Sequence, residues 1–112
     1  MTRLTSRFLV DLLLRRTESA GGFATILAKG DEHSGMILIQ CADRGRPGPL
    51  LERRFSPQGH YVWEAVGPTG SDDDEARANY QDRRRAADPD IWLIELDIAD
   101  APQLVAEWAA LT

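Results

Sequence analysis

The sequence predicts an α+β domain: a mixed, mainly antiparallel five-stranded sheet with an N-terminal helix, a crossover helix and a short C-terminal helix. Three observations predict this class. Apolar residues recur with helical spacing near both ends of the chain, five segments have strand-like patterns, and the first four of these are joined by short connections. Because 112 residues is an ordinary size for one domain, we expect a single domain spanning residues 1–112.

The first segment, Ser6 to about Ala20, is predicted to be an amphipathic helix. Thr5 and Ser6 are residue types that cap helix N-termini, and Gly21-Gly22 is a typical stop. Arg15 and Arg16 fall in the last turn, where the partial negative charge of unpaired carbonyl groups favours cations. The apolar face is formed by Phe8, Leu9, Leu12 and Leu13.

Two strand-like runs follow, Phe23–Lys29 and Gly35–Cys41. The residues between them are polar and have the length and composition of a hairpin loop, so we expect the two runs to pair antiparallel. Both faces of the second run are largely apolar. This pattern is typical of a central strand that is covered on both sides.

Two further strands are predicted between residues 43 and 66. The segment 43–49 contains two glycines and two prolines, and we expect it to be a surface loop because these residues interrupt regular elements. In Leu50–Phe55 one face would have Leu51, Arg53 and Phe55 and the other Leu50, Glu52 and Arg54. This pattern predicts a shorter, more exposed strand towards an edge. A turn separates it from a fourth strand, His60–Val66. Short connections favour an antiparallel meander of strands one to four.

The last three elements are a helix, a strand and a helix. Ser71 is predicted to cap a crossover helix that runs to about Ala87 and exposes most of its surface to water. Ile91–Ile98 alternates cleanly and is expected deep in the sheet, where the crossover permits a parallel return. Asp100 is predicted to cap the final helix. The apolar stripe of that helix consists of Leu104, Trp108 and Leu111.

Composition and charge exclude several classes of protein. The formal net charge is −5. A single cysteine excludes an intramolecular disulfide, and one cysteine with two histidines excludes a zinc finger built from these ligands. The longest dense apolar run, Phe8–Leu14, contains Asp11 and is far too short to span a bilayer, and no signal-peptide cleavage site follows it. We therefore expect a cytoplasmic protein with no membrane association.

Familiar catalytic motifs are absent from the sequence. There is no phosphate-binding loop and no nucleophile elbow. We predict that His33 and His60 are solvent-exposed, that Cys41 is a buried and inert thiol, and that the Glu95 and Asp97 carboxylates lie on a solvated strand face. No catalytic residue, metal or cofactor is therefore predicted. The sequence leaves enzymatic activity open and favours a non-enzymatic role.

Arginines are the most informative candidates for a binding site. If those of several segments gather on one surface, their guanidinium groups suit phosphates and carboxylates equally. The alternative is that they pair with the abundant acidic residues of the same chain. A net charge of −5 opposes nucleic-acid binding, which is not favoured for that reason. The candidate binding residues are Arg15, Arg16, Arg44, Arg46, Arg53 and Arg54, with the aromatic residues Tyr61 and Trp63 as stacking partners.

Several segments together resemble a known family. They are Leu13-Leu14-Arg15-Arg16, Gly21-Gly22-Phe23-Ala24, Lys29-Gly30-Asp31 with Gly35, Glu52-Arg53-Arg54-Phe55 and Asp88-Pro89-Asp90-Ile91-Trp92. The set resembles the small bacterial family catalogued as domain of unknown function 1491 (DUF1491), over nearly the whole chain. The resemblance implies a cytoplasmic α/β domain of about this length with no established activity, substrate or cofactor. The Arg15-Arg16 and Asp88-Asp90 pairs further suggest a salt bridge between the first helix and the helix-to-strand corner.

The preferred functional hypothesis is a non-enzymatic binding or assembly module that self-associates, or that binds another protein, through apolar surface. Trp63, Trp92, Trp108 and the C-terminal stripe are the expected source of that surface. The alternative is a nucleic-acid-associated protein with an arginine-rich surface. The arginines of that surface are Arg44, Arg46, Arg53 and Arg54. An enzyme using Glu95, Asp97 or His33 is the third hypothesis.

Overall fold

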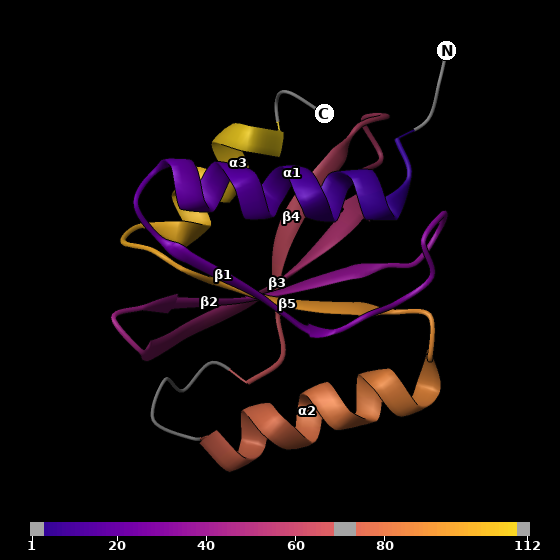
Figure 1. Ribbon diagram of the computed structural model, residues 1–112. Coiled ribbons are helices and arrows are strands. Elements are labelled where there is room, and N and C mark those ends of the chain that lie inside the picture. The colour runs from indigo at the N-terminus through magenta and orange to yellow at the C-terminus, as the bar shows by residue number, and fades with distance from the viewer. Residues whose placement is uncertain (1–3, 69–73, 110–112) are drawn as a thin grey trace.

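The computed structural model describes residues 4–68 and 74–109, which form three helices and five strands (Figure 1). The predicted α+β class and the predicted order of the elements are confirmed. Within the described residues no helix is both long enough and apolar enough to cross a membrane. In chain order the elements are α1 (Ser6–Ser19), β1 (Phe23–Ala28), β2 (Ile37–Asp43), β3 (Arg46–Phe55), β4 (Tyr61–Val66), α2 (Asp74–Ala87), β5 (Trp92–Asp97) and α3 (Ala101–Ala109).

The five strands form one mixed sheet in the order β1-β5-β2-β3-β4. β5 lies between β1 and β2: Ile94 stands opposite Ile26 of the antiparallel neighbour and opposite Ile39 of the parallel one. The parallel return of β5 is confirmed, but the predicted hairpin between β1 and β2 is wrong. β5 is covered on both faces of the sheet, since Ile94 lies in the core under α1 and α3 and Leu93 lies in the cluster on the α2 side. A strand that is apolar on both faces is typical of the interior of a sheet.

The connection between β2 and β3 is a tight turn, so the predicted surface loop over 43–49 is wrong. Arg44 and Gly45 both have positive φ, 54° and 80°, as a two-residue hairpin turn requires. Asp97 of β5 accepts hydrogen bonds from both backbone amides, at 2.7 and 2.9 Å. β3 therefore begins at Arg46. Pro47 fits into the strand because it lies opposite Ala42, where the pairing register between β2 and β3 shifts.

β3 is an interior strand, and its predicted place towards an edge is wrong. It pairs with β2 on one side and with β4 on the other, so β1 and β4 form the two edges. The charged residues that suggested exposure have a different explanation. Glu52, in the middle of β3, is only 1% exposed and pairs with arginines from two elements.

The helices lie on opposite faces of the sheet: α1 and α3 cover one face and α2 covers the other (Figure 1). The larger core lies under α1 and α3. The side of the sheet towards α2 has a smaller apolar cluster, to which α2 contributes the ring of Tyr80. Buried members of the larger core include Leu9, Val10 and Leu13 of α1, Ile39 of β2, Trp92, Ile94 and Leu96 of β5 and Val105 of α3.

Helix α1 has the predicted N-terminal cap, since the Thr5 hydroxyl accepts a hydrogen bond from the amide of Phe8 at 3.1 Å. At the start of α3, the amide of Leu104 donates to the carbonyl of Asp100 at 3.0 Å. Two predicted features, the Ser71 cap of α2 and the Leu111 end of the C-terminal stripe, lie outside the described residues.

The three tryptophans differ in burial. Trp92 is fully buried, and its indole N–H donates to the carbonyl of Asp31 at 2.7 Å. Trp63 and Trp108 are partly buried and pack against the larger core. The prediction that the tryptophans supply apolar surface for association is therefore wrong for Trp92. For Trp63 and Trp108, which keep part of their surface exposed, it stays a prediction.

Candidate functional site

An open cleft of about 640 Å³ lies where the sheet splits at one end. β3 pairs with β2 only as far as Glu52, opposite Leu38, but continues beside β4 to Phe55, opposite Tyr61. The last residues of β3 therefore lie across the cleft from residues 33–36, which precede β2. The start of α1 and residue Arg84 of α2 complete the walls.

The wall opposite β3, residues 31–36, is held in place by hydrogen bonds. The Ser6 hydroxyl donates to the carbonyl of Gly35 at 2.6 Å, and the Ser6 amide donates to the carbonyl of His33 at 3.1 Å. The carboxylate of Asp31 accepts from the amides of His33 and Ser34, at 3.1 and 2.8 Å, and the bonds from Ser34 and His33 lower the pKa of Asp31. The cleft is thus preformed on this side.

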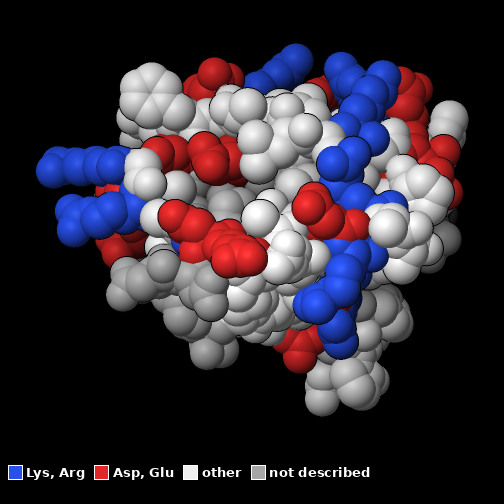
Figure 2. Space-filling view, turned by 90° about the horizontal axis from the view of Figure 1, so that it is seen from below, with Lys and Arg blue, Asp and Glu red and all other residues white. Residues whose placement is uncertain are grey.

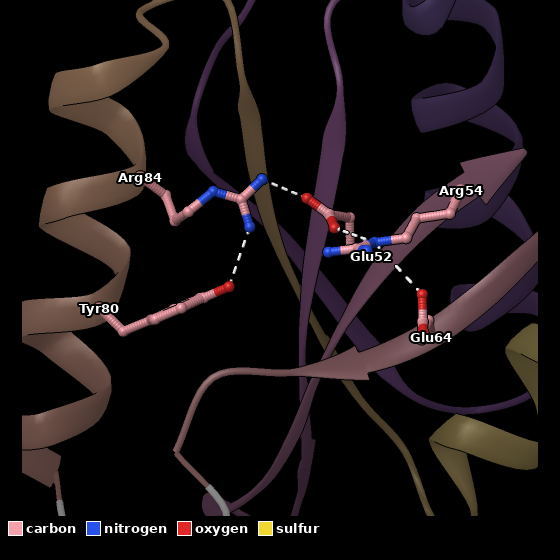
Figure 3. A network of polar contacts seen from close by, with 5 residues as sticks. All are labelled: Glu52, Arg54, Glu64, Tyr80 and Arg84. Carbon is pink, nitrogen blue, oxygen red and sulfur yellow. Dashed lines mark hydrogen bonds and ion pairs between the residues drawn. The ribbon is translucent and has the colours of Figure 1, made fainter.

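The opposite wall contains a buried acid, Glu52, bound by two arginines. Arg84 of α2 donates to its Oε1, and Arg54 of β3 donates to its Oε2 at 2.5 Å. Arg54 also lies 3.2 Å from the carboxylate of Glu64, and Arg84 donates to the hydroxyl of Tyr80 at 2.9 Å. Figure 3 shows Arg84 reaching from α2 and Arg54 from β3 towards the same carboxylate.

The arginines determine the ionisation of Glu52. Burial by itself raises the pKa of this carboxyl group, but the hydrogen bonds from Arg84 and Arg54 outweigh that effect and leave the pKa below its usual value. Glu52 is therefore ionised at neutral pH. Together with Glu64 it neutralises the two arginines, so this network has no net charge.

Arg53 is the cation in the cleft that the network does not neutralise. Its guanidinium carbon lies 3.7 Å from the centre of the Tyr61 ring, a cation–π contact, and Phe55 meets the same ring edge-on at 5.1 Å between ring centres. Among the described residues no carboxylate lies within ion-pair distance of Arg53, and burial lowers the pKa of its guanidinium. A half-buried cation on an aromatic ring is suited to bind an anion.

The structure brings together only part of the predicted site. Arg53, Arg54 and Tyr61 line the cleft. Trp63 is two residues further along β4 and packs against the core. On the face of the molecule seen from the α2 side, basic side chains stand at opposite ends with acidic side chains between them (Figure 2).

The remaining predicted arginines lie away from the cleft. Arg44 and Arg46 are exposed at the β2–β3 turn, the end of β3 opposite Arg53. Arg15 and Arg16 are exposed in the last turns of α1. The predicted gathering of these arginines on one surface is therefore not observed.

The suggested salt bridge between Arg15 or Arg16 and the Asp88–Asp90 corner is wrong. Gly22, just after α1, packs against the carboxyl end of β5, whereas the corner precedes the first residue of β5. The two pairs thus lie at opposite ends of β5, and Figure 1 shows the C-terminal ends of α1 and α2 on opposite sides of the molecule.

Sequence reasoning missed Glu52 and Arg84 as site residues. Glu52 is a polar residue of a predicted strand, and Arg84 lies near the end of a predicted helix, where the partial negative charge of the carbonyl groups favours any cation. Neither signal indicates a contact between residues 32 positions apart. Glu52 follows two leucines but precedes two arginines, so its local sequence does not mark it as buried. Its burial becomes evident only from the strand order.

Of the other residues considered as candidates, His33 lines the cleft, whereas Cys41, Glu95 and Asp97 do not. Cys41 is buried as predicted, and burial raises the pKa of its thiol to about 12, so it is inert at neutral pH. The carboxylate of Asp97 accepts a hydrogen bond from the β2–β3 turn, and Glu95 lines a separate small cavity between α2 and the sheet. In the described part of the chain, no three His, Cys, Asp or Glu side chains come together as a metal site would require.

Comparisons with known proteins agree with the resemblance in sequence. The family model for a protein of unknown function (DUF1491) matches residues 4–106. The crystal structure of a DUF1491 family protein from Caulobacter crescentus is similar, with a TM-score of 0.74, 31% identity and coverage of 83% of this chain and 86% of that chain.

Two solution structures are also similar. An NMR structure of a DUF1491 family protein from Caulobacter crescentus has a TM-score of 0.74 and 30% identity, covering 89% of this chain and 90% of that one. Protein Atu0922 from A. tumefaciens has a TM-score of 0.70 and 28% identity, covering 92% of both chains. No curated protein matches the chain.

Proposed function

The chain belongs to the DUF1491 family, whose function is unknown, and we propose that it is a non-enzymatic binding module whose cleft takes a small organic anion. One observation carries the proposal. Arg53 stands in the cleft with its guanidinium group on Tyr61 and without a carboxylate partner among the described residues, while the neighbouring arginines are neutralised.

The charge of the cleft indicates a ligand with a single anionic group. Arg54 and Arg84 are balanced by Glu52 and Glu64, so one positive charge remains, that of Arg53. A guanidinium fork donates two parallel hydrogen bonds to the oxygens of a carboxylate or phosphate. The half-buried position of Arg53 strengthens such a bond relative to one in open water.

The shape of the cleft indicates that the anion has an apolar part. A volume of about 640 Å³ is within the range of small-molecule sites. Apolar side chains line it beside the charged ones, and Phe55 and Met36 are exposed at 63% and 39%. Desolvation of these side chains by a ligand would add to its affinity.

The chemistry of the cleft supports binding rather than catalysis. Its buried acid, Glu52, has a lowered pKa and both oxygens engaged by arginines, so it is a poor general acid or base near neutral pH. Nucleic-acid binding has less support, because it needs several cations along one surface, and Arg44 and Arg46 lie at the far end of β3 from Arg53.

Calorimetric titration with matched probes tests the proposal. Benzoate and phenyl phosphate carry the two candidate head groups on one ring, and benzyl alcohol is the neutral analogue. We expect at least one anion to bind at least about tenfold more tightly than the alcohol, because a charge-assisted hydrogen bond contributes about 1.5–3 kcal/mol.

Two variants serve as the matched pair for this titration. Arg53→Gln removes the free cation and should weaken anion binding by about tenfold or more. Arg46→Gln removes an exposed arginine at the far end of the same strand and should leave it unchanged. Absence of binding by both anions, or equal loss in the two variants, would refute the proposal.

A further inference from the structure

β1 is an edge strand whose outer side has no partner in the described chain. It pairs only with β5, and three of its apolar side chains are exposed: Phe23 at 77%, Leu27 at 47% and Ile26 at 37%. The sequence from residue 20 to residue 28 contains no charged side chain. An uncharged, apolar edge of this kind is a template for pairing with a further strand.

The other edge of the sheet is protected in the ways that usually prevent such pairing. β4 has the charged residue Glu64 at its centre, in contact with Arg54. Helix α3 packs beside β4 and covers part of it. Charged and covered edges resist strand addition, so the two edges of this sheet differ in kind.

We propose that two copies of the chain associate through β1, with the strands antiparallel about a two-fold axis at Thr25. The sheet then continues from one copy into the other. Antiparallel pairing of identical strands is self-complementary, which is the geometry of a closed dimer. It also matches the composition of β1, because the partner strand is as uncharged and apolar as the strand it meets.

Side chains alternate between the two faces from Phe23 to Leu27, and this alternation determines the register. The register of β1 against β5 shifts between Ile26 and Ala28, at the end of this stretch. Phe23, Thr25 and Leu27 point to the α2 face, since they stand opposite Asp97 and Glu95 or share a cavity with Glu95. Directly opposed residues in an antiparallel pair lie on one face, so the axis passes through a residue and not between two.

An axis at Thr25 gives the pairing with the most apolar contact. Phe23 of each copy then stands opposite Leu27 of the other, and the two Thr25 side chains face each other. An axis at Ala24 would place Leu27 opposite Gly21. An axis at Ile26 would place Phe23 opposite Lys29.

The charges that flank β1 are also complementary in this arrangement. Glu18 precedes the strand and Lys29 follows it. Antiparallel strands bring the Lys29 end of each copy towards the Glu18 end of the other, where the C-terminal carbonyl groups of α1 add partial negative charge. Lys29 pairs with Glu32 of its own copy at 3.3 Å, but its side chain is 59% exposed and therefore accessible to a partner.

Sedimentation equilibrium from micromolar to millimolar protein tests the association. The wild-type chain should show a reversible monomer–dimer equilibrium. Thr25→Lys opposes two positive charges at the axis and should weaken dimerisation by at least about tenfold, a change of about 1.4 kcal/mol. Phe23→Lys alone should also weaken it, whereas Phe23→Lys with Leu27→Glu places opposite charges across the axis and should restore it.

Disulfide cross-linking tests the register independently. Thr25→Cys should give a covalent dimer under mild oxidation, since opposed residues at the axis have Cα atoms within disulfide range. Ala65→Cys, an exposed position on the β4 edge, should not. The native Cys41 is buried and does not compete. A chain that stays monomeric throughout, or a dimer insensitive to Thr25→Lys and not linked by Thr25→Cys, would overturn the proposal.

Discussion

At the scale of single residues, Glu52 is the acid that links β3 to α2. It is buried, and it is the carboxylate that Arg84 of α2 and Arg54 of β3 share. The loss of one partner from a buried charge network leaves the others uncompensated, which is more costly than losing an exposed ion pair.

We therefore expect Glu52→Gln to lower the free energy of unfolding by about 3 kcal/mol, because two arginines lose their common counter-charge. Glu64→Gln removes an exposed carboxylate that pairs with Arg54 and should lower the free energy of unfolding by less than about 1 kcal/mol. Urea denaturation monitored by tryptophan fluorescence measures both. Equal effects of the two substitutions would contradict the central place of Glu52.

The same carboxylate predicts a pH dependence. Its pKa in the folded chain lies below the ordinary value of 4.5, so the folded state binds fewer protons than the unfolded state just below that pH. The stabilisation by Glu52 is complete above about pH 4.5 and is lost as the pH falls through the lower folded pKa. Urea titrations of the wild type and Glu52→Gln should therefore differ most at neutral pH and converge in acid.

At the scale of elements, the turn between β2 and β3 shows what local sequence does and does not reveal. Two prolines and two glycines predict an irregular segment, yet the backbone turns in two residues and the strand continues through Pro47. The decisive partner is Asp97, more than 50 residues away, which accepts hydrogen bonds from the amides of Arg44 and Gly45. No short segment of the sequence contains both partners of these hydrogen bonds.

Opposite effects are expected at the two turn positions. Gly45 has φ of 80°, so Gly45→Ala should destabilise the protein by about 1 kcal/mol. Arg44 has φ of 54°, and Arg44→Asn should stabilise it by about 0.5 kcal/mol, because Asn-Gly is the preferred pair for this turn. Thermal unfolding measures both, and a change of the same sign in both variants would contradict the turn geometry.

At the scale of the whole molecule, the sequence predicts the elements well and their pairing poorly. Periodicity and caps locate all three helices and five strands, since these signals are local. The place of β5 between β1 and β2 depends on contacts between segments far apart in the sequence, which local patterns do not contain.

In the candidate site, too, the local features could be predicted from the sequence and the long-range contacts could not. Arg53, Arg54 and Tyr61 could be selected from the sequence as cations and an aromatic ring near one another in a predicted pair of strands. Glu52 with Arg84, and the wall formed by Ser6 and His33, depend on contacts across the sheet and between α1 and the chain before β2.

The proposed function depends on the cleft at the split end of the sheet. An NMR titration of the ¹⁵N-labelled chain with benzoate and with phenyl phosphate locates binding residue by residue. We expect saturable shifts at His33, Ser34, Arg53 and Tyr61, absent with benzyl alcohol and absent in Arg53→Gln. No saturable shift with either anion, or shifts confined to the Arg44–Arg46 end of the sheet, would show that the cleft is not a binding site for organic anions.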